Sequence, residues 1–154
     1  MWENKEDAEK IEEQQQKYDK LAAIGLKRLK RASIIGAVVL LFHIVVLGLG
    51  SPYVLIPAVL LFVLAVLGLC KNSDMGFYAF CAALFFCTAL WVSDIYKLIV
   101  LTLALFGNSK AEVKMWLSFI AMLLFLVSYI LSVRLLFLDE NVHTWKSFRR
   151  HSGR

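Results

Sequence analysis

Few residues of this 154-residue sequence could do chemistry in an apolar environment, and three of them raise the main question. Asp94 and Lys97 interrupt the apolar run "CTALWVSDIYKLIVLTLALFG", residues 87–107, and His43 is the ionisable residue of the apolar run 32–49. Ionisable side chains inside membrane spans are rare and usually belong to functional sites. We therefore take His43, Asp94 and Lys97 as candidate polar residues of an intramembrane or interfacial site.

The interpretation we favour places Asp94 at the membrane interface. If the third apolar segment has the same length as the first two, it covers 76–93 and ends just after Trp91, whose ring prefers the interface. The carboxylate of Asp94 would then be solvated and would need no partner. Residues 95–107 would form a short apolar segment that lies in the interface.

The alternative is one continuous helix over 76–106, because no Gly or Pro lies inside that range to end it. At about 1.5 Å per residue this helix would be roughly 46 Å long. Asp94 would then lie deep in the membrane and would need His43 or Lys97 as a partner. For His43 itself, we favour a neutral imidazole bonded to a neighbouring helix over a proton carrier.

The other reactive side chains form no catalytic or metal-binding pattern. His143 and His151 lie in the C-terminal tail, far in sequence from any cysteine. The sequence has three cysteines and no CxxC motif, and this odd number argues against a disulfide framework. They are Cys70, Cys81 and Cys87. The sequence has no Gly-rich phosphate loop and no nucleophile elbow. We expect no enzyme activity, cofactor or metal, and we note Cys70 as a candidate for palmitoylation.

These polar residues must be positioned by membrane-spanning helices, because 60% of the residues are hydrophobic and only 2 are proline. A span needs about 20 apolar residues. The sequence predicts four, over about 32–49, 53–70, 76–93 and 115–133, within a transmembrane domain at 32–138. The predicted fold class is an all-α integral membrane protein, a four-helix bundle.

The distribution of Lys and Arg predicts the orientation of these spans. The N-terminal segment, the loop 71–75 and the C-terminal tail are rich in Lys and Arg, whereas the opposite side carries Lys97, Lys110 and Lys114. This bias predicts a multi-pass protein of an endomembrane or the plasma membrane with both termini in the cytosol. The acidic start "MWENKEDAEKIEEQQQKYDK" resembles neither a signal peptide nor a presequence, so we expect the first span to direct insertion.

The two ends of the chain are polar. Residues 1–31 are rich in helix-forming residues and predict a charged cytosolic helix, acidic first and then basic, and residues 139–154 form a basic tail. No basic stretch alternates with exposed aromatic residues, so we expect no nucleic-acid partner. We expect anionic lipid at the cytosolic face to contact a basic cluster, which consists of Lys27, Arg28, Lys30 and Arg31.

Small residues at intervals of three and four predict where the helices pack, because small side chains let helix backbones approach closely. Packing within the chain is the favoured interpretation, and a homo-oligomer or a partner helix is the alternative. The predicted packing residues are Ala32, Gly36, Ala79, Ala83, Ser118, Ser128 and Ser132.

Two functions remain open at this point. The first is a non-enzymatic structural or accessory subunit that binds other membrane-protein subunits through its apolar surface and its charged helix. The second is a small transporter or channel module in which His43, Asp94 and Lys97 line a polar path. We favour the first, because the sequence offers few polar residues to line a path.

Overall fold

The computed structural model of the chain describes residues 3–48, 52–107 and 113–152. These residues form five α-helices and no strand. The helices are α1 (Glu3–Leu47), α2 (Pro52–Cys70), α3 (Asp74–Gly107), α4 (Val113–Leu138) and α5 (Glu140–Ser152). The prediction of an all-α chain is therefore confirmed.

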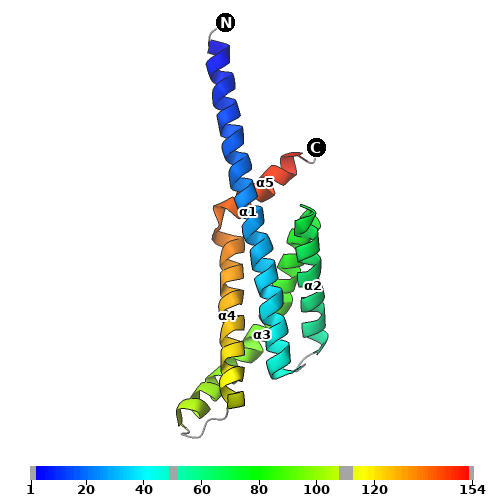
Figure 1. Cartoon of the computed structure of the whole chain (residues 1–154), viewed down its shortest axis with the longest axis vertical. Helices are drawn as coiled ribbons and strands as arrows, with labels where there is room; N and C mark the ends of the chain where they lie inside the picture. The colour runs from blue at the N-terminus through cyan, green and yellow to red at the C-terminus, as the bar shows by residue number, and fades with distance from the viewer. Residues whose placement is uncertain (1–2, 49–51, 108–112, 153–154) are drawn as a thin grey trace.

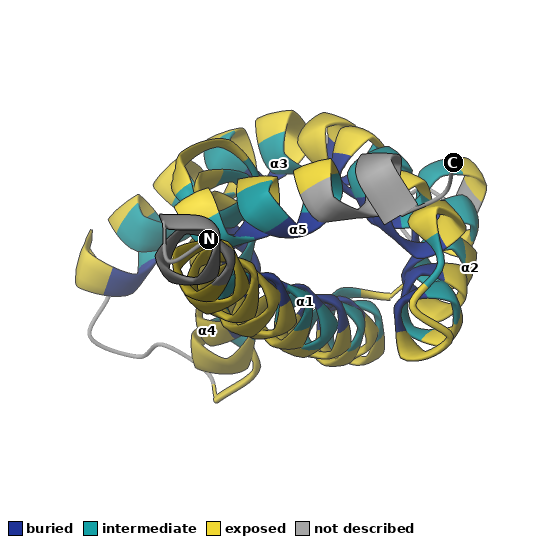
Figure 2. Cartoon of the chain, turned by 90° about the horizontal axis from the view of Figure 1, so that it is seen from above, coloured by how far each residue is buried: buried dark blue, intermediate teal, exposed yellow. Residues whose placement is uncertain are grey.

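Helices α1 to α4 form an up-and-down bundle, and both termini lie at the same end of the molecule (Figure 1). By length and composition, four helices are long and apolar enough to cross a membrane, as predicted. The inward faces of the helices are buried, and their outward faces are exposed (Figure 2). The exposed faces are rich in Leu, Ile, Val and Phe, the composition that faces lipid rather than water.

The helix predicted over 1–31 is confirmed for its described residues, but it is not separate from the first span. Helix α1 is continuous from Glu3 to Leu47, without a break between its charged and apolar parts. Residues 9–20 are exposed on all sides, and burial begins only at Ala22. The N-terminal part of α1 therefore projects beyond the bundle as a single helix (Figure 1).

The prediction of a separate segment after residue 93 was wrong. Helix α3 does not end at 93 but continues to Gly107, a length of 34 residues. The physical reason is local, since residues 77–106 contain neither Gly nor Pro and every one of them can continue a helix. Helix α3 crosses the bundle obliquely, and its C-terminal end extends past α4 (Figure 1).

The α2–α3 hairpin is the most extensive helix pair of the bundle, and glycine makes its close approach feasible. A Cβ atom built on Gly68 would lie 2.5 Å from the Cα atom of Gly76, a distance at which backbone would have to move. Helix α2 ends in a Schellman motif, in which Ser73 N donates to the Gly68 carbonyl (2.8 Å) and Asn72 N to the Leu69 carbonyl (3.1 Å). Asn72 adopts the left-handed conformation that this motif requires, with φ of 52°.

The predicted packing residues differ in burial. A Cβ atom on Gly36 would lie 2.6 Å from the Phe62 ring of α2, so this glycine does mark a close contact between helices. Three of the seven residues are buried and the other four are partly buried. The buried ones are Gly36, Ala83 and Ser132, and the partly buried ones are Ala32, Ala79, Ser118 and Ser128.

The C-terminal segment, which we had taken as a tail, forms helix α5 and packs against α1. Val142 and Trp145 of α5 are buried, and a Cβ atom on Gly25 of α1 would collide with the backbone of Asn141. Trp145 Nε1 donates a hydrogen bond to the Asn72 side chain (3.2 Å). Helix α5 thereby joins α1 to the turn between α2 and α3.

Asp139 holds the start of α5. Its Oδ1 atom accepts hydrogen bonds from the backbone N–H groups of Asn141 (2.9 Å) and Val142 (3.3 Å), and its Oδ2 atom pairs with Arg28. Partial burial by itself raises the pKa of Asp139, but the hydrogen bond from Arg28 and those from the backbone outweigh it. The pKa of this carboxyl therefore lies below its ordinary value of 3.8.

We expect Asp139→Ala to lower the free energy of unfolding by about 1 kcal/mol near neutral pH, because an N-cap is lost. A carboxyl with a lowered folded-state pKa stabilises fully above its unfolded-state value and loses this contribution as pH falls through the folded-state value. The difference between wild type and variant should therefore shrink below pH 3.8. Denaturant titrations at neutral and acidic pH measure this, with Glu140→Gln as the control. A difference that does not depend on pH would contradict the role of the carboxylate.

Candidate functional site

The candidate site is a buried ionic cluster between α1 and α3. Asp94 of α3 is 2% exposed, although it is a carboxylic acid. Its Oδ2 atom lies 3.1 Å from Nε2 of His43 on α1, and its Oδ1 atom lies 3.5 Å from Nζ of Lys97. The structure thus brings His43 next to Asp94 and Lys97, the other two polar residues that the sequence singled out.

Asp94 is therefore buried, whereas the interpretation we favoured from the sequence leaves it exposed, and both partners named in the alternative lie beside it. His43 reaches it from α1, whereas Lys97 is one turn further along α3 itself. His43 is 4% exposed, but the Lys97 side chain is 55% exposed. Of the two residues beside Asp94, Lys97 is thus the one whose side chain can move away from the carboxylate.

Within the described part of the chain, the hydrogen bonding of this cluster is incomplete. The Nδ1 atom of His43 has no hydrogen-bond partner. The Oδ2 atom of Asp94 is near His43 Nε2, but the two groups are not aligned as a hydrogen bond. A carboxylate has acceptor sites for about four hydrogen bonds, and the one hydrogen bond given to Asp94, from Lys97, is long at 3.5 Å. Buried polar atoms without partners are costly and often mark functional sites.

A pocket of about 360 Å³ opens beside the cluster. His43, Asp94, Lys97 and Ser93 supply its polar groups, and the rest of its wall is mostly apolar. This composition, apolar walls with a few polar groups, is typical of small-molecule sites, which have volumes of about 300–1,000 Å³. The remaining wall residues come from α1 to α4 and from the residue that follows α1. They are Leu47, Gly48, Val54, Leu55, Ala89, Leu90 and Met122.

The pocket lies toward the end of the bundle opposite to the two termini, where α1 ends at Leu47 (Figure 1). The ring of Phe125 packs on His43 with centroids 5.0 Å apart and forms part of the core next to the site. A second pocket, nearer the other end, has a volume of only about 10 Å³, close to the size of one water molecule. A third, of about 340 Å³, lies beside Arg134 and Asp139.

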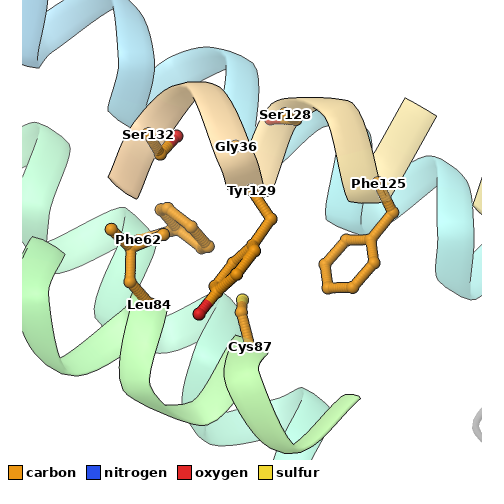
Figure 3. Close-up of a pocket in the computed structure, with 8 residues that line it drawn as sticks. All are labelled: Gly36, Phe62, Leu84, Cys87, Phe125, Ser128, Tyr129 and Ser132. Carbon is orange, nitrogen blue, oxygen red and sulfur yellow. The ribbon is translucent and has the colours of Figure 1, made fainter. Parts of the chain in front are cut away.

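Figure 3 shows the second pocket, where Phe62, Cys87 and Tyr129 point toward one another between the helices. Thr88 and Tyr129 share a hydrogen bond of 2.8 Å and join α3 to α4. Around this level the core is closely packed and apolar, with Phe80 and Leu84 buried.

The other candidate residues form no comparable site. Cys70, Cys81 and Cys87 are free thiols, and Cys70 is the exposed one, at the end of α2. His143 lies 3.3 Å from the Phe137 carbonyl, and the side chain of His151 is outside the described residues. Among the residues described, no group of three His, Cys, Asp or Glu could hold a metal ion.

The basic cluster lies where α1 meets the bundle. Lys27 and Arg31 are exposed and Lys30 is partly buried. Arg28 differs from them because it pairs with Asp139 and holds α5. Sequence reasoning missed that role, for which Asp139 at the start of a short amphipathic segment was the available signal.

The fold and the site thus define a helical bundle with four candidate membrane-spanning helices and a buried polar cluster at one end. A scan against protein-family models gives no match, and neither do comparisons with curated proteins and with solved structures.

Proposed function

We propose that this chain is a non-enzymatic multi-pass membrane protein that acts as a structural or accessory subunit of a larger membrane complex. The observation that carries this proposal is the projecting part of α1. Residues 9–20 are exposed on every face and extend away from the bundle as a single helix. Isolated helices of this length are marginal in water, and most helices in proteins are stabilised by packing.

The sequence of this projecting helix favours a protein partner. Glu9, Glu12 and Glu13 make its outer part acidic, whereas Lys17 and Lys20 begin the basic part near the bundle. Anionic lipid at the cytosolic face attracts the basic part but repels the acidic part. We therefore assign the basic part to the membrane surface and the acidic part to another subunit, with a second copy of this chain as the alternative partner.

Deletion of residues 1–16 tests this assignment. We expect the shortened chain to insert normally, because its four spans are intact, but to lose partner subunits on purification in mild detergent. The control replaces Glu9, Glu12 and Glu13 with Gln, which keeps the helix and removes its charge, so that it separates charge recognition from the helix itself. Unchanged recovery of every partner from the deletion variant would contradict the proposal.

We further propose that both termini lie in the cytosol. The two termini and the α2–α3 turn share one end of the bundle (Figure 1), which is also the end rich in Lys and Arg. In a chain without native cysteines, Ser73→Cys and Ser147→Cys should be shielded from an impermeant thiol reagent in intact cells. Ser109→Cys, which lies outside the described residues, should react. Labelling of Ser147→Cys from outside would overturn this orientation.

Cys70 stays a candidate for palmitoylation in this proposal. It is exposed at the end of α2 that lies with the termini, where a cytosolic enzyme could acylate it. Hydroxylamine-sensitive labelling that is lost in Cys70→Ser would support the modification, and labelling that persists would contradict it.

A second candidate function, a small transporter or channel module, is favoured by one observation. His43, Asp94 and Lys97 line a pocket of about 360 Å³ rather than a fully packed core. Transport would require a continuous polar path, formed by a rearrangement or between subunits. Solute flux into proteoliposomes that is lost in Asp94→Asn would support this function, and equal flux in both proteins would contradict it.

A further inference from the structure

The pocket beside Asp94 is large enough to hold a small molecule, and its chemistry restricts what that molecule can be. Its volume is about 360 Å³. The walls contributed by α2 and α4 are apolar, with Val54 and Leu55 from the first and Met122 from the second. The charged groups that face it therefore all come from α3, and the titratable His43 comes from α1.

The pocket contains a negative charge, that of Asp94, which its surroundings compensate only in part. Asp94 is the one acid among the described wall residues, and it is buried, with an Oδ2 atom that accepts no hydrogen bond. Its cationic partner, Lys97, is 3.5 Å away and has a side chain that is 55% exposed. A lysine held so loosely can move its ammonium group to the interface while its methylene chain stays in apolar surroundings.

We propose that this pocket binds a small organic amine in its protonated form, with the ammonium group on Asp94 and the apolar remainder against Leu47, Leu55 and Met122. The ligand replaces Lys97 as the donor to the Oδ1 atom of Asp94. An anionic ligand would have to approach the buried carboxylate, and a neutral apolar ligand would leave it unsatisfied. A metal ion lacks ligands, because no group of three candidate donors exists among the described residues.

This inference goes beyond both proposed functions, since a site can be occupied without transport and without a partner complex. It also uses Lys97 in a specific way, as a built-in competitor of the ligand for Asp94. Removal of Lys97 should therefore strengthen binding, whereas loss of a residue that simply contacts a ligand weakens it.

The test uses the full-length protein in lipid nanodiscs at pH 8, with 4-fluorobenzylammonium as the probe and fluorine NMR line broadening as the readout. Empty nanodiscs correct for partition into lipid. We expect saturable binding of the ammonium, and binding at least about tenfold weaker of 4-fluorobenzyl alcohol, which has the same shape without the charge. Asp94→Asn should weaken binding of the ammonium by about tenfold or more, and Lys97→Gln should strengthen it.

Glu140→Gln removes an exposed carboxylate outside the pocket and should leave binding unchanged. If Asp94→Asn fails to fold, two other results still decide the question. These are the comparison of the ammonium with the alcohol on the wild type, and binding of the ammonium by Lys97→Gln. Equal binding of the alcohol, or binding that is unchanged or weaker in Lys97→Gln, would overturn the proposal. Copurification of partners is measured separately, so failure here leaves the subunit assignment intact.

Discussion

Replacement of His43 with leucine should lower the free energy of unfolding by about 3 kcal/mol. This variant removes the closest partner of Asp94 from the other helix and leaves a carboxylate that is 2% exposed. Removal of the polar neighbour of a buried acceptor costs about 1–3 kcal/mol, and more where the acceptor is charged. We expect a loss of about 3 kcal/mol because the acceptor is charged, and no more than that because Lys97 stays within 3.5 Å. Reversible unfolding in mixed micelles measures the loss.

The matched control is His143→Leu. His143 is exposed on α5, where its Nε2 atom lies 3.3 Å from the Phe137 carbonyl oxygen, so its replacement should change the free energy of unfolding by about 0.5 kcal/mol or less. If His43→Leu were as mild as this control, Asp94 would not depend on the imidazole and our assignment of the cluster would be wrong.

A second large effect is expected at the α2–α3 hairpin, where Gly76→Leu should cost about 3 kcal/mol. A Cβ atom on Gly76 would overlap the backbone of Gly68 and Leu69, and a backbone cannot move aside as a flexible side chain can. Overpacking typically costs about 1–3 kcal/mol, and we expect the upper end for a backbone clash. Thermal denaturation in detergent, followed by circular dichroism, measures the loss.

Gly107→Leu provides the control for this substitution, because a Cβ atom at Gly107 meets nothing within 4 Å. The same residue change should therefore be tolerated there. Equal stability of the Gly76 and Gly107 variants would show that α2 and α3 do not approach each other as closely as described.

The helical class and the four candidate spans could be predicted from the sequence because they depend on the length of apolar runs. Apolar segments of about 20 residues bordered by polar ones carry this information locally. The small-residue pattern likewise identified Gly36, which does face Phe62 of α2. It missed Gly68 and Gly76, because they lie on different helices and meet only across the hairpin.

The length of α3 and the environment of Asp94 could not be settled from local pattern. A tryptophan followed closely by a charged residue, as in Trp91 and Asp94, is typical of the end of a span, and this pattern favoured an end at 93. The competing factor is tertiary, since His43 from another helix lies 3.1 Å from the carboxylate and makes its burial feasible. Nothing near Asp94 in the sequence indicates that contact.

Helix α5 was missed because its 13 residues are mostly polar, as in a solvated tail. Two signals were available in the sequence, namely Asp139 at an N-cap position and apolar Val142 and Trp145 at helical spacing. Whether this segment packs as a helix depends on Gly25 of α1, which leaves room for α5 to approach. Gly25 is more than a hundred residues away in the chain.

A double-mutant cycle on His43 and Asp94 tests most directly whether the two residues form a coupled buried pair. The variants are His43→Leu, Asp94→Leu and the double substitution, each unfolded in the same mixed micelles. We predict a coupling free energy of at least about 1 kcal/mol and a double variant more stable than His43→Leu, because the double variant leaves no buried carboxylate without its polar neighbour. Additivity within about 0.5 kcal/mol, with the double variant the least stable of the three, would contradict the pair.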